Sequence, residues 1–207
     1  MRKVILGSFV SVDGIMQAPG GPEEDASGGF KYGGWVFPFW DETTDQAVEH
    51  SLSWPYDLLL GRKTYDIFAS YWPHQEDGPN AKIAKEFNAA TKYVATSSAA
   101  PLAWRNSAAL RDPAQEVARL KQEDGPNLVI QGSSVLVHTL LAHDLIDEIT
   151  LMVFPVFLGQ GKRLFGEDAA GALKLVSSRA SASGVTINTY TRAGPVPTGS
   201  FVADAPS

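Results

Sequence analysis

Apolar and β-branched residues recur in short runs along this chain, and several of the runs are apolar at nearly every position. KVILGSFVSV at residues 3–12 is one such run, and YDLLL at residues 56–60 is another. Short runs that are apolar on both faces are typical of strands buried inside a sheet. The same kind of pattern predicts strands over residues 92–98, around 107–112, and over 127–132 and 146–158, with a closing pair within 173–192.

Segments of helical character separate most of these strands. Asp112 followed by Pro113 indicates a helix start, because an aspartate caps free backbone N–H groups and a proline at the first helical position needs no partner. Helices are predicted over residues 41–53, 64–72, 81–90, 113–122 and 133–144. This alternation predicts an α/β fold with a mostly parallel central sheet flanked by helices. The last two strands have no helix between them, which predicts an antiparallel C-terminal edge.

A long irregular segment follows the first predicted strand. Residues 16–40 hold six glycines, three prolines and a group of aromatic residues. Loops of this length are uncommon inside compact domains and are often functional. Two interpretations are open for this segment: a structural or subunit-contact loop, and a lid over a binding pocket.

Composition narrows the class of protein. The length of 207 residues suits a single domain, predicted over residues 1–192, with a tail at 193–207 that is rich in small residues and proline. The absence of cysteine excludes disulfides and thiolate sites, and the four histidines lack zinc-site spacing, so no metal is expected. A net charge of −6 without a basic block argues against nucleic acid as a partner. No apolar run could span a bilayer and no signal-peptide pattern occurs, so we expect a cytoplasmic protein without a membrane partner.

Three of the predicted strands end in residues that suit an anion. The residues are Gly61, Arg62, Lys63 and Thr64 after one strand, Thr96, Ser97 and Ser98 after the next, and Gln131, Gly132, Ser133 and Ser134 after the third. In an open α/β sheet such junctions share one edge, where ligands bind and helix N-termini point. Taken singly, each junction is commonly a helix cap or a turn. Taken together, they suit a ligand with phosphates at two places, such as a dinucleotide, although the GxGxxG fingerprint of an ordinary Rossmann domain is absent.

The order of SVDG, GRKTYD, ATSS and VIQGSS along the chain resembles the dihydrofolate reductase-like fold. The segment PVFLGQGKRLF is similar to a signature of one branch of that fold, the branch that includes the reductase domain of bacterial riboflavin biosynthesis. The resemblance covers residues 2–192, and GRKTY and PVFLGQGKRLF are its more specific parts. It implies a dihydrofolate reductase-like α/β fold and a reductase whose cofactor is NADPH.

The resemblance also implies which residues bind NADPH. Arg62, Lys63 and Thr64 match the turn that binds the 2′-phosphate and the pyrophosphate, and a 2′-phosphate needs local positive charge. Folate reductases begin the glycine-rich turn under the pyrophosphate with two glycines, and Gln131 replaces the first of them here. The full set implied for the cofactor is Phe9, Val10, Gln17, Gly61, Arg62, Lys63, Thr64, Thr96, Ser97, Ser98, Ile130, Gln131, Gly132, Ser133 and Ser134.

The resemblance identifies substrate-binding residues less completely than cofactor-binding residues. Folate reductases hold the pterin ring with a carboxylate on the helix before GRKTY, and Asp45 lies on the corresponding predicted helix. Asp13 is a candidate proton relay or substrate ligand. Both acids also fit structural roles, Asp45 in the first turn of a helix and Asp13 in an Asp-Gly turn. In the riboflavin branch a lysine commonly follows that Asp-Gly, whereas Ile15 stands here. The candidates for a substrate wall are Trp35, Phe37 and Trp40.

The leading hypothesis is an NADPH-dependent reductase that transfers a hydride to a small heterocycle, pteridine-like or pyrimidine-like, resembling 5-amino-6-(5-phosphoribosylamino)uracil reductase. A second hypothesis is a non-catalytic NADP(H)-binding or regulatory protein, because fold does not fix function. A third is a phosphate-ester enzyme that uses the same anion site. The resemblance further implies a homodimer, formed through the antiparallel edge and the final strands.

Overall fold

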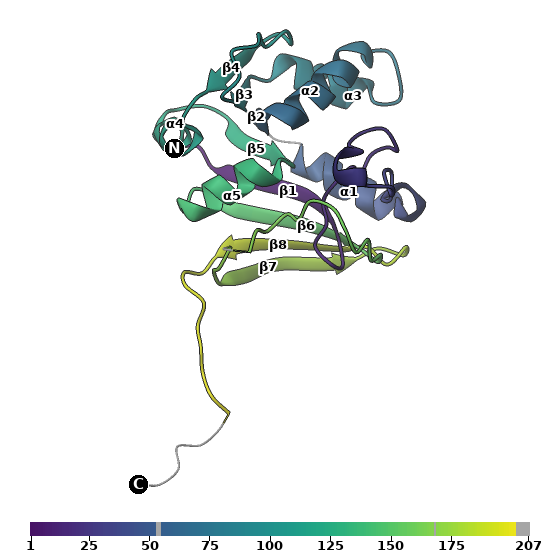
Figure 1. Cartoon of the computed structure of the whole chain (residues 1–207), viewed down its shortest axis with the longest axis vertical. Coiled ribbons are helices and arrows are strands. Elements are labelled where there is room, and N and C mark those ends of the chain that lie inside the picture. The colour runs from purple at the N-terminus through teal and green to yellow at the C-terminus, as the bar shows by residue number, and fades with distance from the viewer. Residues whose placement is uncertain (53–54, 168, 202–207) are drawn as a thin grey trace.

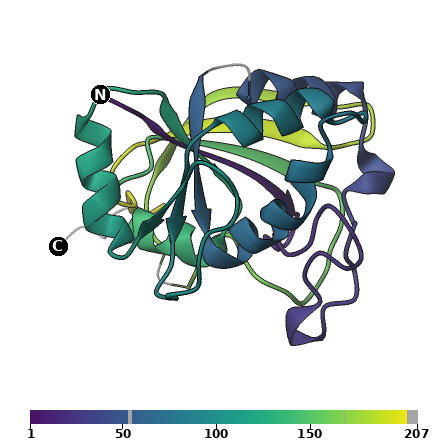
Figure 2. The same cartoon turned by 90° about the horizontal axis from the view of Figure 1, so that it is seen from above.

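The computed structural model describes residues 1–52, 55–167 and 169–201, which form one sheet with helices on both faces (Figure 1, Figure 2). The strands are β1 Val4–Ser11, β2 Tyr56–Gly61, β3 Lys92–Ala95, β4 Ser107–Leu110, β5 Asn127–Gln131, β6 Glu148–Phe154, β7 Leu173–Ala180 and β8 Thr186–Arg192. Their order in the eight-stranded sheet is β4-β3-β2-β5-β1-β6-β8-β7. β8 is antiparallel to both β6 and β7, and the other neighbouring pairs are parallel. The predicted α/β fold, with its mostly parallel sheet and antiparallel C-terminal edge, is confirmed.

The helices are α1 Glu42–Ser51, α2 Arg62–Tyr71, α3 Ala81–Ala89, α4 Pro113–Gln122 and α5 Ser134–Ala142, with short 3-10 turns at Ser27–Gly29, Phe37–Phe39 and Trp72–His74. The predicted end of the first helix, Ser53, lies outside the described residues. β6 ends at Phe154, earlier than predicted, because Pro155 has no backbone N–H to continue the ladder. Across the described ranges, no helix is long and apolar enough to cross a membrane.

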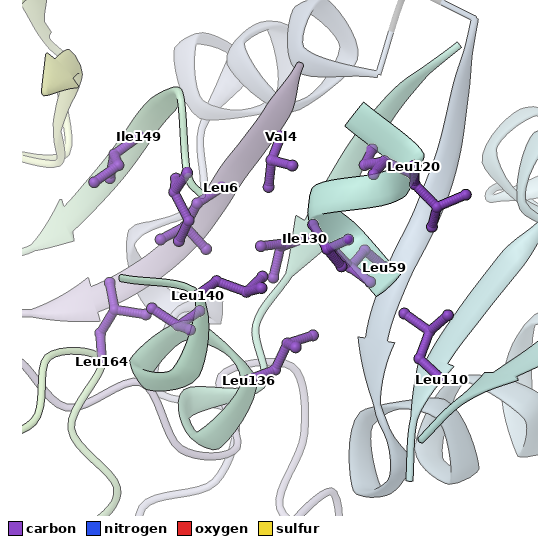
Figure 3. Close-up of a cluster of buried hydrophobic side chains, with 14 of the residues drawn as sticks. Val4, Leu6, Leu59, Leu110, Leu120, Ile130, Leu136, Leu140, Ile149 and Leu164 are labelled. Atoms are coloured by element: carbon purple, nitrogen blue, oxygen red, sulfur yellow. The ribbon is translucent and has the colours of Figure 1, made fainter. Parts of the chain in front are cut away.

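Two apolar layers hold the helices on the sheet. On one face, Leu6 of β1 packs in a cluster with Leu120 of α4 and Leu140 of α5, and all three side chains are essentially buried (Figure 3). On the other face, α2 and α3 cover the β2 side of the sheet, with Tyr65 and Phe87 in a separate cluster. These layers fix the start of each helix relative to the end of the strand before it.

The centre of the sheet determines where a ligand site can form. β5 lies between β2 and β1 and is parallel to both, with Leu58 opposite Val129 and Leu6 opposite Ile130. The carboxyl ends of β2 and β5 are therefore neighbours, and α2 and α5 begin directly beyond them. This is the sheet edge at which ligands bind in parallel α/β folds.

A buried lysine lies at the opposite end of β3. The Lys92 ammonium donates hydrogen bonds to the backbone carbonyl oxygens of Asn88 (3.1 Å) and Ala90 (2.8 Å), and it lies 4.3 Å from the centroid of the Trp104 ring. Burial, followed by the positive charge of Arg105, lowers the pKa of Lys92 to about 8. The ammonium therefore caps the carbonyl groups at the C-terminal end of α3, and burial of its positive charge beside Arg105 is unfavourable.

This cost predicts how stability changes with pH. Because the pKa of Lys92 is lower in the folded chain than in the unfolded chain, unfolding takes up a proton at pH 8 to 10, and the lysine's contribution to stability rises with pH there. We expect the free energy of unfolding of the wild type to increase over this range relative to that of Lys92→Met. Denaturant titrations at several pH values measure this. Lys85→Met, which removes an exposed lysine of α3, is the control, and parallel curves for wild type and Lys92→Met would refute the assignment.

Candidate functional site

Two helix starts are joined at the carboxyl ends of β2 and β5. The backbone N–H of Gly61 donates to the hydroxyl oxygen of Ser133 (2.7 Å), and that hydroxyl donates to the hydroxyl oxygen of Thr64 (2.7 Å). Gly61 precedes α2, and Ser133 precedes α5. Free N–H groups and the helix dipoles make such starts attractive to anions, so the joined pair is suited to bind a phosphate group.

The backbone before α5 has an unusual shape. Gly132 and Ser133 both have positive φ angles, 89° and 74°, so a non-glycine residue adopts the left-handed conformation next to a glycine. A β-carbon at Gly132 would lie 3.2 Å from the methyl carbon of Met16, which shows that the 16–40 loop passes close to the start of α5. Two further predicted residues lie on β5: Ile130 is fully buried in the core, and Gln131 ends the strand half-buried.

Two arginines lie near the carboxyl ends of β2, β3 and β4. Arg62 donates to Asp66 (2.9 Å) and to the backbone carbonyl oxygen of Ala100 (3.0 Å). Arg111 donates to the carbonyl oxygens of Thr96 (3.0 Å) and Ser98 (2.6 Å). Two guanidinium groups thus lie beside the turn at residues 96–98, in which Ser97 and Ser98 are exposed and Thr96 is buried. Guanidinium groups are suited to phosphate oxygens, so this pair is a candidate phosphate site separate from the helix starts.

Sequence reasoning missed Arg111. It directly follows the last residue of β4 and precedes Asp112, the cap of α4, just as Arg62 directly follows β2. The signal in the sequence is a cation near the carboxyl end of a predicted strand.

The 16–40 loop is held against α2 by a buried carboxylate. Asp25 accepts hydrogen bonds from the Lys63 ammonium (2.5 Å), the Lys162 ammonium (2.6 Å) and the Ser27 hydroxyl (2.6 Å). Burial alone would raise the pKa of Asp25, but these donors outweigh burial and hold its pKa well below the ordinary value. Asp25 is therefore ionised at any physiological pH.

Gln17, a predicted cofactor residue, is engaged within the same loop. Its amide nitrogen donates to the carbonyl oxygens of Asp25 and Ser27 (both 2.9 Å), and its amide oxygen accepts from the backbone N–H of Lys162 (3.0 Å). The loop after β6 and the 16–40 loop lie side by side, as Figure 2 shows. A cavity of about 270 Å³ opens between them, with Gln17, Phe30 and Lys162 in its lining.

The aromatic residues divide into core and surface. Phe9 of β1 contacts the Trp40 ring edge-on at 5.5 Å between centroids, which joins a predicted nicotinamide-side residue to a predicted substrate-wall residue. Trp35 is buried and donates to the carbonyl oxygen of Gln17 (2.8 Å), whereas Phe37 is 82% exposed. Val10 packs on the other face of the sheet, among the α4 and α5 contacts.

The two candidate catalytic acids have different surroundings. Asp13 accepts from the Ser11 hydroxyl (2.6 Å) and from the backbone N–H groups of Leu158 (3.2 Å) and Gly159 (2.8 Å). Burial alone would raise the pKa of Asp13, but these hydrogen bonds lower it. Asp45 is exposed on the first turn of α1, which Asp41 caps. In the part of the chain that the structure describes, histidine and acidic residues form no group able to hold a metal ion.

Solved structures share this architecture. A putative riboflavin biosynthesis protein from Shewanella sp. PV-4 superposes with a TM-score of 0.62 at 19% identity, covering 92% of this chain and 99% of its own. A dihydrofolate reductase from Enterococcus faecalis, complexed with NADP(H) and RAB-propyl, gives 0.55 at 16% identity, covering 92% and 96%. A pyrimidine reductase-like protein from Corynebacterium diphtheriae gives 0.56 at 14% identity, covering 93% and 92%. The chain therefore has a dihydrofolate reductase-like fold.

The sequence comparison is more specific. Residues 2–187 match the RibD C-terminal domain, and the chain belongs to that family. Two similar proteins of Bacillus subtilis strain 168 are both described as uncharacterized. YyaP is 27% identical over 191 residues, covering 91% of this chain and 94% of the relative, and YwjB is 29% identical over 170 residues, covering 80% and 84%.

The packing of Gly61 on Ser133 yields a testable prediction. A β-carbon at Gly61 would lie 2.9 Å from the Ser133 hydroxyl oxygen, which is held by two hydrogen bonds. We expect Gly61→Ala to lower the free energy of unfolding by about 1–3 kcal/mol, the usual cost of overpacking. In a Ser133→Gly background the same change should be nearly neutral, because the obstructing side chain is gone. Equal costs in both backgrounds, measured by denaturant titration, would contradict this packing.

Proposed function

We propose that this protein is an NADPH-dependent reductase that transfers a hydride to a small heterocyclic substrate of the pteridine or pyrimidine type. The observation that carries the proposal is the pair of helix starts joined through Ser133, with the guanidinium groups of Arg62 and Arg111 beside the segment after β3. The helix starts suit a diphosphate, and the two guanidinium groups suit a 2′-phosphate. The Enterococcus faecalis reductase of the same fold is a complex with NADP(H), which supports this cofactor.

When bound, NADPH supplies the hydride. The protein binds and orients the cofactor and the substrate, and it excludes water from them. Arg62 and Arg111 would hold the 2′-phosphate, and the starts of α2 and α5 would hold the diphosphate. Phe9 and Trp40 form an aromatic wall that can shield the reacting rings from water. The Asp13 carboxylate, held by its three donors, orients the loop after β6.

A second function stays open because of Asp13. Its carboxylate is occupied by three donors and its pKa is lowered, so it is poorly suited to give a proton to a substrate. The alternative is a non-catalytic NADP(H)-binding or regulatory protein on the same fold. The two functions differ in whether bound NADPH is oxidised. A screen of pteridine and pyrimidine substrates, followed by the absorbance of the reduced nicotinamide, separates them.

Cofactor preference is the first test. We expect wild type to bind NADPH more tightly than NADH in calorimetric titrations. Arg62→Ala should weaken NADPH binding by about 10- to 100-fold, because charge-assisted hydrogen bonds to the 2′-phosphate are lost. The affinity for NADH, which lacks that phosphate, should change little. Arg119→Ala is the matched control, because Arg119 is an exposed arginine of α4 paired with Glu123. Equal affinities for NADPH and NADH in the wild type, or an unchanged affinity in Arg62→Ala, would refute the cofactor assignment.

We also propose that the protein forms a homodimer through β7. This strand ends the sheet, its eight residues are all exposed, and Leu173, Leu175 and Val176 are 41%, 52% and 59% exposed. An exposed apolar edge strand offers unpaired backbone groups to a second strand. Pairing β7 with β7 of a second copy would bury the apolar side chains and would give the unpaired backbone groups hydrogen-bond partners.

Light scattering tests the dimer. Wild type should have twice the mass of the chain, and Leu175→Glu should have the mass of a single chain, because it places a charge in the contact. Val196→Glu, which changes an exposed apolar residue of the C-terminal segment, should stay dimeric. A monomeric wild type, or a Leu175→Glu variant that remains a dimer, would be inconsistent with this interface.

A further inference from the structure

Asp25 is a buried anion placed between two cations from different parts of the chain. Its side chain is 8% exposed, whereas those of Lys63 and Lys162 are 52% and 41% exposed. Each carboxylate oxygen takes one ammonium group, and the N–H and hydroxyl groups of Ser27 complete the shell. The lysines therefore keep open sides toward solvent while the carboxylate lies beneath them.

Lys63 has a second possible partner. It is the second residue of α2, and the next residue is Thr64, whose hydroxyl contacts Ser133. In the proposed function, the diphosphate of NADPH lies over that helix start. A lysine side chain is a mobile point charge on a flexible stem, so its ammonium can exchange one oxygen anion for another.

Because of Lys162, Asp25 keeps a cationic partner when Lys63 moves away. If Lys63 leaves Asp25, the carboxylate keeps Lys162 at 2.6 Å and both Ser27 donors. Without Lys162 the same movement would leave a buried carboxylate with no cation, which is strongly unfavourable. Because two ammonium groups bind one carboxylate, Lys63 can bind a ligand while Lys162 still neutralises Asp25.

We propose that Asp25 is a positioning residue that sets the affinity for the cofactor: it holds Lys63 when the diphosphate is absent, and Lys162 retains Asp25 when Lys63 turns to the diphosphate. This inference rests on the proposed function and goes beyond it, because it assigns opposite effects to two residues that both hold the same loop. Asp25 competes with the cofactor for Lys63, whereas Lys162 relieves that competition.

Calorimetric titration of the full chain with NADPH tests the proposal. Asp25→Asn removes the competing charge and should tighten NADPH binding by about threefold or more, whereas Lys162→Met should weaken it by about tenfold. Glu23→Gln and Lys31→Met remove an exposed charge of each sign from the same loop and should change affinity little. In an Asp25→Asn background, Lys162→Met should no longer weaken binding, and this double variant keeps the test valid if a single variant folds poorly.

A second ligand separates exchange at Lys63 from a general change in charge. Adenosine 2′-phosphate carries the phosphate proposed for Arg62 and Arg111 but no diphosphate, so all variants should bind it alike. Weaker NADPH binding in both Asp25→Asn and Lys162→Met would mean that the carboxylate only orders the loop, and it would overturn the proposal. Unchanged NADPH binding, or parallel changes for adenosine 2′-phosphate, would overturn it as well. If wild type fails to bind NADPH, the proposed function itself fails, whereas normal wild-type binding without the opposite effects refutes this inference alone.

Discussion

The hydroxyl group of Ser133 is the contact on which the candidate site depends. It accepts from the backbone of Gly61 and donates to Thr64, so it joins the start of α5 to the start of α2. The contact exists because β2 and β5 are parallel neighbours, which places both helix starts at one edge of the sheet. It also requires a left-handed backbone at Ser133 and no side chain at Gly61. Sheet order, helix placement and local backbone shape therefore converge on one hydroxyl group.

A second set of contacts brings the 16–40 loop to that edge. The loop has little regular structure, and buried polar groups hold it: Gln17 bonds to the carbonyl oxygens within it, and Asp25 joins it to α2 and to the loop after β6. Trp35 adds a hydrogen bond to Gln17 and packs against Phe154 of β6. Buried polar networks of this kind specify one arrangement when every member has its partners. The loop thus has a defined position next to the helix starts.

Periodic features of the sequence predicted the fold well. Apolar runs identified the buried strands, because a strand covered on both faces has no polar alternation, and Asp112-Pro113 marked the start of α4. The positions of Gly61, Arg62 and Ser133 at strand ends followed from the same pattern. What the pattern could not predict was pairing between distant residues. Asp25 and Lys162 are 137 residues apart, and nothing local in either segment indicates that a carboxylate and an ammonium will meet. Arg111 was missed for a related reason, since its partners, the carbonyl oxygens of Thr96 and Ser98, lie beyond the end of another strand, β3.

A crystal structure of the protein with NADPH bound is the strongest test of the proposed cofactor site. We expect the diphosphate over the starts of α2 and α5, beside the Ser133–Thr64 contact, and the 2′-phosphate between Arg62 and Arg111. A cofactor bound elsewhere, or a diphosphate that contacts neither helix start, would contradict this expectation.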